Sequence, residues 1–176
     1  MWGHHIAFGL PFIKEGVIID TNAKTFTAEP SMPSNRRFEP GKKFIWPNGI
    51  GVKGNNDNAS IVDGITGAPY SELCYLEGYK KDAYYSIKNE KLNLSFDLNW
   101  NGDLFKCLWM WEERCATQDF PWWGDCYTVA LEPWTSSGTN EPEKAIARSE
   151  WLKILPGEFI ETDLSAKISE GDHMSS

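Results

Sequence analysis

The chain has 176 residues, of which 41% are hydrophobic and 24% are charged, and its formal net charge is −8. This length supports one ordinary domain with its own core, and the composition is that of a globular protein. The acidic balance argues against nucleic-acid binding and against binding to anionic membranes, because phosphate groups repel a negative surface.

The first half of the chain predicts few regular elements. Residues 12–20 and 24–28 predict a hairpin that turns near residues 20–23. The prolines of residues 29–47 and the glycine, asparagine and aspartate residues of 49–69 predict two long loops. The neighbours Arg36 and Arg37 are predicted to lie solvated on the surface.

The second half of the chain predicts mostly strands. Residues 92–100 alternate apolar and polar side chains, which is typical of a half-buried strand. Further strands are predicted over residues 73–76, 83–87, 104–111, 126–131, 151–155 and 159–164. One short helix is predicted over residues 141–149, because Pro142 suits the first helical position.

These elements predict an all-β fold, an antiparallel β-sandwich of short strands with long loops. We expect one domain over residues 1–168 and a disordered polar tail over 169–176. No apolar run reaches the roughly 20 residues of a spanning helix, and residues 1–12 lack the basic segment of a signal peptide. We therefore expect a cytoplasmic protein.

The four cysteines indicate reduced thiols rather than a metal site. Cys74, Cys107, Cys115 and Cys126 form no CxxC motif, and no histidine lies near them at metal-ligand spacing. We expect neither a metal nor another cofactor.

Aromatic residues are unusually frequent, with nine Trp, six Tyr and nine Phe. They indicate either an aromatic core or a surface that stacks on flat ligands such as sugar rings. Trp109, Trp122, Trp123 and Trp134 are candidates for the floor of a sugar pocket, although such residues also fill cores.

Two regions carry candidate acid–base groups. His4 and His5 are adjacent, so in an extended segment they point to opposite faces and only one can enter a pocket. Glu132 follows an apolar strand, where burial is costly unless the carboxylate is paired or used. The alternatives are that both histidines are structural and that Glu132 faces water. A His and a Glu together suit acid–base chemistry on a sugar hemiacetal.

Several segments resemble aldose 1-epimerases (galactose mutarotases) in the same order along the chain. WGHHIAFG (residues 2–9) is similar to a WGHHPAFG stretch of that superfamily. LEPWTS (131–136), which follows PWWG (121–124), resembles the segment that holds the family's catalytic glutamate. The strands of residues 73–111 and the sequence LPGE (155–158) fit the C-terminal part of the family.

The resemblance implies a galactose mutarotase-like β-sandwich and a monosaccharide or sugar derivative as substrate. Glu132 would act as the general base on the anomeric hydroxyl and His5 as the general acid at the ring oxygen, with His4 in support. Glu72 lies where the family carries a substrate-binding aspartate. The family's N-terminal strands have no counterpart here, so we expect a fragment, a shortened protein or a homo-oligomer that completes the sandwich.

The leading hypothesis is therefore an isomerase that interconverts sugar anomers. The alternative is a carbohydrate-binding module of the same fold that has lost catalysis. A third hypothesis is a structural domain whose aromatic residues all belong to the core.

Overall fold

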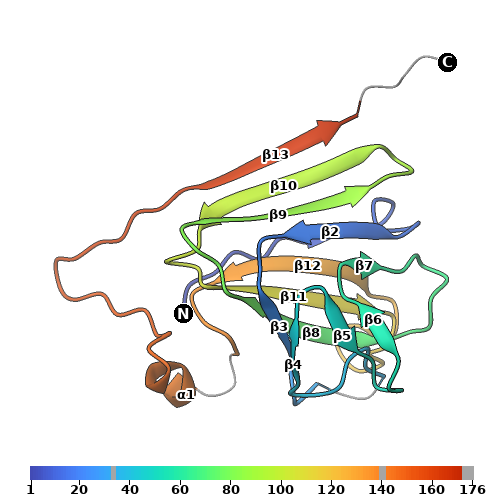
Figure 1. The fold of residues 1–176 in the computed structure, drawn as a ribbon, viewed down its shortest axis with the longest axis horizontal. Coiled ribbons are helices and arrows are strands. Elements are labelled where there is room, and N and C mark those ends of the chain that lie inside the picture. The colour runs from blue at the N-terminus through green and yellow to red at the C-terminus, as the bar shows by residue number, and fades with distance from the viewer. Residues whose placement is uncertain (33–34, 139–141, 172–176) are drawn as a thin grey trace.

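Two large antiparallel sheets and one two-stranded sheet form the protein, whose computed structural model describes residues 1–32, 35–138 and 142–171. The larger sheet has the order β1-β12-β11-β8-β3-β4 and the smaller one β13-β10-β9-β2-β7 (Figure 1). The strands of the larger sheet are β1 (Ala7–Phe8), β12 (Tyr127–Trp134), β11 (Cys107–Arg114), β8 (Ser71–Glu77), β3 (Thr25–Ala28) and β4 (Lys43–Ile45).

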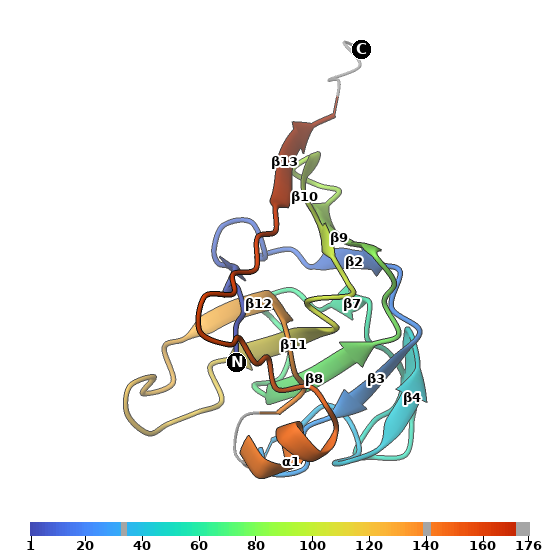
Figure 2. The ribbon, with the colours of Figure 1, turned by 90° about the vertical axis from the view of Figure 1, so that its left-hand side faces the viewer.

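The remaining elements complete the second sheet and its connections. The smaller sheet holds β13 (Leu164–Glu170), β10 (Leu94–Asn101), β9 (Asp82–Asn89), β2 (Val17–Thr21) and β7 (Ile61–Val62). Strands β5 (Asn48–Ile50) and β6 (Asn56–Asn58) pair with each other, and the helix is α1 (Pro142–Ala147). The predicted antiparallel β-sandwich is confirmed. A turned view shows β13 and α1 at opposite ends of the molecule (Figure 2).

The core lies between the two sheets, as strand alternation requires. Phe26, Leu76 and Met110 of the larger sheet are fully buried, and they belong to one cluster with Tyr85 and Ile87 of the smaller sheet. Burying a side chain of this size stabilises a protein by about 1.5–3 kcal/mol. The opposite face of the larger sheet carries a different set of side chains, among them Tyr75 and Trp109.

The predicted hairpin between residues 12–20 and 24–28 is wrong. Strand β2 pairs with β7 and β9, whereas β3 pairs with β4 and β8, so the chain changes sheets between Thr21 and Thr25. Alternation was visible in both strands, but each finds its partners far along the chain. The two predicted loops also contain strands, namely β4 in the first and β5 to β7 in the second.

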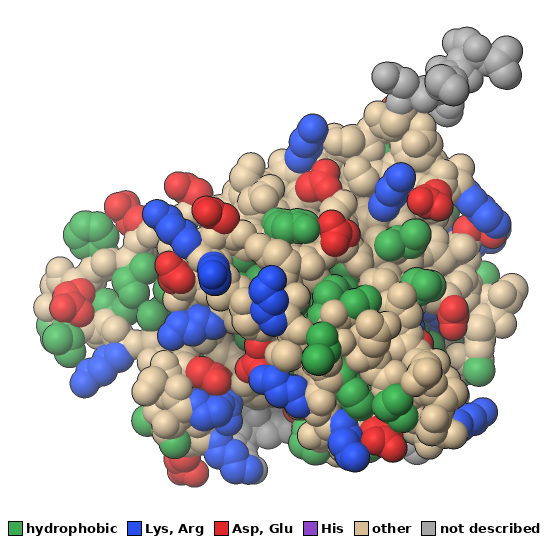
Figure 3. All heavy atoms as spheres, in the orientation of Figure 1, with side chains coloured by type: hydrophobic (Ala, Val, Ile, Leu, Met, Phe, Trp, Pro, Cys, Tyr) green, Lys and Arg blue, Asp and Glu red, His purple; other side chains and the backbone are tan. Residues whose placement is uncertain are grey.

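The C-terminal region also differs from the expectation. Residues 151–155 and most of 159–164 form no strand, and β13 runs instead over Leu164–Glu170. The connecting segment exposes apolar side chains (Figure 3). Phe159 is 79% exposed and Leu155 is 50% exposed. Of the expected tail, Ser169 and Glu170 pair with β10, and residues 172–176 lie outside the described residues. Helix α1 falls within the predicted helix, whose residue 141 is also outside them.

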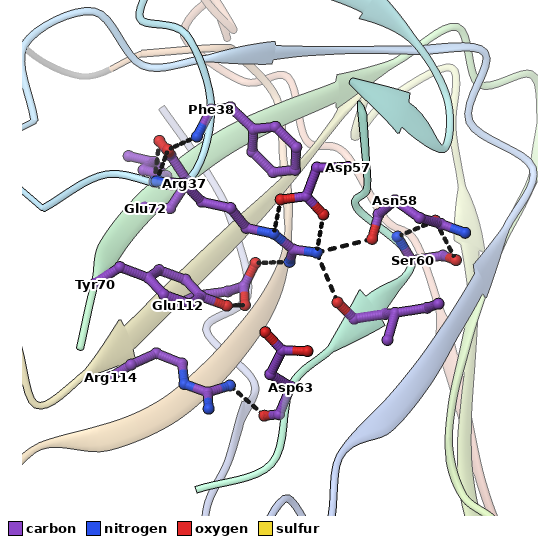
Figure 4. Close-up of polar contacts among 12 residues, drawn as sticks. Arg37, Phe38, Asp57, Asn58, Ser60, Asp63, Tyr70, Glu72, Glu112 and Arg114 are labelled. Atoms are coloured by element: carbon purple, nitrogen blue, oxygen red, sulfur yellow. Dashed lines mark hydrogen bonds and ion pairs between the residues drawn. The ribbon is translucent and has the colours of Figure 1, made fainter. Parts of the chain in front are cut away.

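The side chains of Arg36 and Arg37 are buried, being 7% and 8% exposed, which corrects the prediction that they are solvated on the surface. The Arg37 guanidinium bonds both oxygens of Asp57, at 3.1 and 2.9 Å, and Glu112 Oε1 at 3.0 Å (Figure 4). Burial opposes its charge, but Glu112 and Asp57 outweigh burial and raise the Arg37 pKa. Arg37, predicted as a surface residue, therefore links its loop to β6 and to the larger sheet from inside the protein.

Candidate active site

The candidate site lies on the face of the larger sheet that points away from the core. The register places Glu132 of β12 opposite Trp109 of β11, and Trp109 opposite Tyr75 of β8. Residues paired across neighbouring strands share a face. Tyr75, Trp109 and Cys107 form a second buried cluster, separate from the core between the sheets.

His5 and Glu132 are brought together from distant parts of the chain. Gly3 bridges to Trp134 and Ala7 pairs with Ala130, so His5 lies opposite Glu132. The His5 Nδ1 is 2.7 Å from Glu132 Oε1. The His5 side chain is 57% exposed and that of Glu132 only 6%. A buried carboxylate thus meets an imidazole that reaches solvent.

Trp134 holds the second oxygen of the same carboxylate. Its indole Nε1 donates to Glu132 Oε2 at 2.9 Å. The Trp134 ring stacks on Trp109, with ring centroids 4.7 Å apart. Gly3 approaches the ring so closely that a Cβ at residue 3 would lie 2.2 Å from a ring carbon. Because its ring already packs against Trp109 and Gly3, Trp134 is placed to orient Glu132 rather than to stack on a sugar.

Trp109 packs against Tyr75, which leads to a second carboxylate, that of Glu29. Its Nε1 donates to the Ser136 carbonyl at 2.8 Å, and its ring packs edge-on against Tyr75 at 5.4 Å. Trp109 is 8% exposed, so little of its ring is open to a ligand. The Tyr75 hydroxyl donates to Glu29 Oε2, and both burial and that carboxylate raise the Tyr75 pKa.

The accessible aromatic surface near His5 comes from Trp111 and Trp122. Trp111 lies 6.4 Å from the His5 ring and 5.3 Å from Trp122. Trp122 is 36% exposed and belongs to the loop between β11 and β12. Trp123, on the same loop, is 60% exposed and packs against Phe120. The part of this surface nearest His5 is therefore Trp111 and Trp122.

His4 and Glu72 lie away from this group. The His4 ring packs on the core side against Phe105, at 5.1 Å, and its buried Nε2 has no hydrogen-bond partner among the described residues. Glu72 is fully buried and accepts hydrogen bonds from Arg36 and from the backbone of Phe38. Burial raises the Glu72 pKa against these bonds. Both residues serve the packing of the sheet in this arrangement.

Sequence reasoning missed Trp111, Glu29 and Gly3. Trp111 could have been found, because it is two residues from Trp109 and must share its face of the strand. Glu29 meets Tyr75 only through the pairing of β3 with β8, and the closeness of Gly3 to Trp134 depends on the register of β1. No local sequence pattern predicts either of these contacts.

The described ranges contain neither a metal-ligand cluster nor a membrane-spanning helix. No three His, Cys, Asp or Glu side chains gather there as a metal site. No helix in those ranges is long and apolar enough to cross a membrane.

Comparison with known proteins gives one structural similarity. The chain is similar to the crystal structure of a candidate aldose 1-epimerase from Klebsiella pneumoniae subsp. pneumoniae MGH 78578, with a TM-score of 0.60 and 12% identity. The similarity covers 96% of this chain and 38% of that one. No protein-family model matches the sequence, and no curated protein matches it significantly. The similarity shows the fold, which is the fold that the sequence motifs predicted.

Proposed function

We propose, from the aldose 1-epimerase-like fold and the contact between His5 and Glu132, that this chain interconverts the anomers of a free sugar or sugar derivative. The observation that carries the proposal is the 2.7 Å contact between the two groups on the outer face of the larger sheet. A buried carboxylate beside an exposed imidazole is suited to moving a proton near neutral pH.

The reaction asks for little beyond proton transfer and a binding surface. A proton leaves the anomeric hydroxyl, the ring oxygen gains one, and the C1–O5 bond opens to the aldehyde. Rotation about C1–C2 then lets the ring close on the opposite face. Trp111 and Trp122 supply apolar rings beside His5 on which a sugar can stack.

Anomer exchange measured by NMR tests this proposal. We would use a panel of aldoses, hexuronates and sugar phosphates, with wild type, His5→Gln and Glu132→Gln. Wild type should exchange at least one sugar faster than buffer, and both variants should lose about 10²–10⁴-fold of that acceleration. Glu90→Gln is the matched control, because its side chain is 65% exposed and far from the site in sequence; it should exchange like wild type.

A carbohydrate-binding module without catalysis is the second candidate. It is favoured by Phe120 and Trp123, which expose 79% and 60% of their surface on one loop. Saturable quenching of tryptophan fluorescence by a sugar, without faster exchange on folded protein, would replace the enzyme by this module. Neither quenching nor exchange with any sugar of the panel would reject both candidates.

A further inference from the structure

We infer that His5 is the one group that exchanges protons with the sugar, and that Glu132 acts through His5 as a positioning residue. This inference rests on the proposed function, and it divides the roles differently from the resemblance. The resemblance places Glu132 on the anomeric hydroxyl. The structure places the exposed imidazole ring of His5 between that carboxylate and solvent.

Both oxygens of Glu132 are already bonded within the protein. Oε1 faces His5 Nδ1 at 2.7 Å, and Oε2 accepts the Trp134 indole N–H at 2.9 Å. The side chain is 6% exposed, so a sugar hydroxyl has little of it to reach. His5, in contrast, is 57% exposed. The accessible proton-transfer atom of the pair is therefore on the imidazole.

The chemistry of the two partners decides which nitrogen that is. An ionised carboxylate only accepts hydrogen bonds, so His5 Nδ1 must carry the proton that it shares with Glu132. In the neutral imidazole, Nε2 then holds the free lone pair. Glu132 thus fixes the tautomer in which the outward nitrogen is a base.

The surroundings hold this arrangement in place. On either side of His5, the His4 N–H bonds the Pro133 carbonyl at 3.0 Å and the Leu131 N–H bonds the Ile6 carbonyl at 2.9 Å. Trp134 is in turn stacked on Trp109. Because an indole N–H can only donate, Trp134 requires an acceptor at the Oε2 position.

One nitrogen, His5 Nε2, is enough to balance both proton transfers of the reaction. His5 Nε2 takes the proton of the anomeric hydroxyl as the C1–O5 bond breaks and the C1=O1 bond forms. The electron pair of the broken bond stays on O5, and the imidazolium returns the same proton to it. O1 and O5 share C1, so a single nitrogen can serve both. After rotation about C1–C2 the steps reverse, and Glu132 stays ionised throughout.

The orientation of a glutamine at position 132 provides a sharp test. In Glu132→Gln, the Trp134 donor should draw the amide oxygen to itself and turn the amide NH2 toward His5. The NH2 forces the His5 proton onto Nε2, which can then no longer act as a base. We expect kcat to fall toward the buffer rate with KM little changed, as a wrong tautomer costs about 10⁴-fold in a serine protease.

Removing the Trp134 donor should then restore activity to the glutamine variant. In Glu132→Gln/Trp134→Phe the amide is free to turn its oxygen to His5 and recover the Nδ1–H tautomer. We expect enzyme-dependent exchange at least tenfold above that of Glu132→Gln. If Glu132 were itself the base, glutamine would fail in either orientation, so a double variant as inactive as the single one overturns the inference.

Nitrogen-15 NMR of the His5 ring tests the inference without any sugar. Wild type should carry the neutral-form proton on Nδ1, Glu132→Gln should carry it on Nε2, and the double variant should return it to Nδ1. A wild-type proton on Nε2 overturns the inference even in an active protein. A wild type that shows the expected tautomers but no anomer exchange rejects the proposed function and keeps the His5–Glu132 arrangement.

Discussion

At the scale of single residues, the absence of a side chain at Gly3 sets the position of Trp134. The indole ring lies where a Cβ of residue 3 would stand, 2.2 Å from its Cδ2 atom. Trp134 in turn donates to Glu132. A small residue at position 3 is therefore a condition for the geometry of the contact between His5 and Glu132.

We predict that Gly3→Ala displaces Trp134 and lowers both stability and anomer exchange. Overpacking of this kind costs about 1–3 kcal/mol, and denaturation in urea measures it. Gly9→Ala is the matched control, because a Cβ at Gly9 meets nothing within 4 Å; it should change stability little. Equal stability and activity of the two variants would contradict the packing described for Trp134.

Glu29 illustrates a residue whose charge the fold stabilises. It is 9% exposed, and it accepts hydrogen bonds from the Ser31 N–H, at 3.0 Å, and from Tyr75. Burial opposes the charged form, but the bonds from Ser31 and Tyr75 outweigh burial and lower the Glu29 pKa. A carboxyl with a lowered folded pKa stabilises the protein above the unfolded pKa, and this stabilisation is lost as the pH falls through the folded one.

We therefore predict that Glu29→Gln flattens the acid side of the stability profile. The variant should be about 1 kcal/mol less stable than wild type at pH 7, and the difference should shrink as the pH falls below about 4. Urea denaturation at a series of pH values measures both. Glu90→Gln should keep the wild-type slope; a difference between wild type and Glu29→Gln that persisted at low pH would refute the assignment.

The candidate site shows what a sequence reveals about single residues. His5 and Glu132 were proposed from motifs, and the structure places them in contact. Alternation also predicted that His4 and His5 diverge, and they do. The roles expected for Trp134 and Glu72 depend instead on distant neighbours, Gly3 for one and Arg36 for the other. Side-chain chemistry alone does not specify such partners.

At the scale of elements, Arg37 joins three parts of the chain that are separate in sequence. Its guanidinium bonds Asp57 in β6 and Glu112 in β11 (Figure 4). It also donates to the Ile61 carbonyl of β7. Removing one partner of a buried charge network leaves the other charges uncompensated.

We predict that Arg37→Met destabilises the protein by about 3–5 kcal/mol, measured by urea denaturation. Lys43→Met is the control, because the Lys43–Glu77 pair is exposed and worth at most about 1 kcal/mol. Adding Glu112→Gln to Arg37→Met should recover part of the loss. Equal effects of the two single variants would show that the Arg37 network contributes no more than a surface pair.

The elements that the sequence predicted best are those with clear alternation and neighbouring partners. Residues 92–100 were expected as a strand, and β10 runs over Leu94–Asn101 beside β9. Residues 151–155 have the composition of a strand, but they pair with no strand, and Trp151, Ile154 and Leu155 are exposed. A segment with the composition of a strand forms one only where the fold offers it a neighbouring strand to pair with.

At the scale of the whole molecule, the fold class followed from the sequence, whereas the assignment of strands to sheets did not. The short step from β2 to β3 looks like a hairpin but crosses between layers. Pairings such as β1 with β12 and β10 with β13 join segments far apart in the chain. Such pairings are governed by the packing of both sheets together, which a local pattern does not encode.

The two-residue strand β1 has a consequence for how long the site stays assembled. It lies at the edge of the larger sheet and pairs with β12 through Ala7 and Phe8, and His5 lies two residues before it. Edge segments open locally at a lower free energy than the core. Opening of this strand would part His5 from Glu132 while both sheets remain folded. We expect the lifetime of the contact between His5 and Glu132 to follow a local equilibrium of the N-terminal strand, and amide hydrogen exchange there would report on it apart from global unfolding.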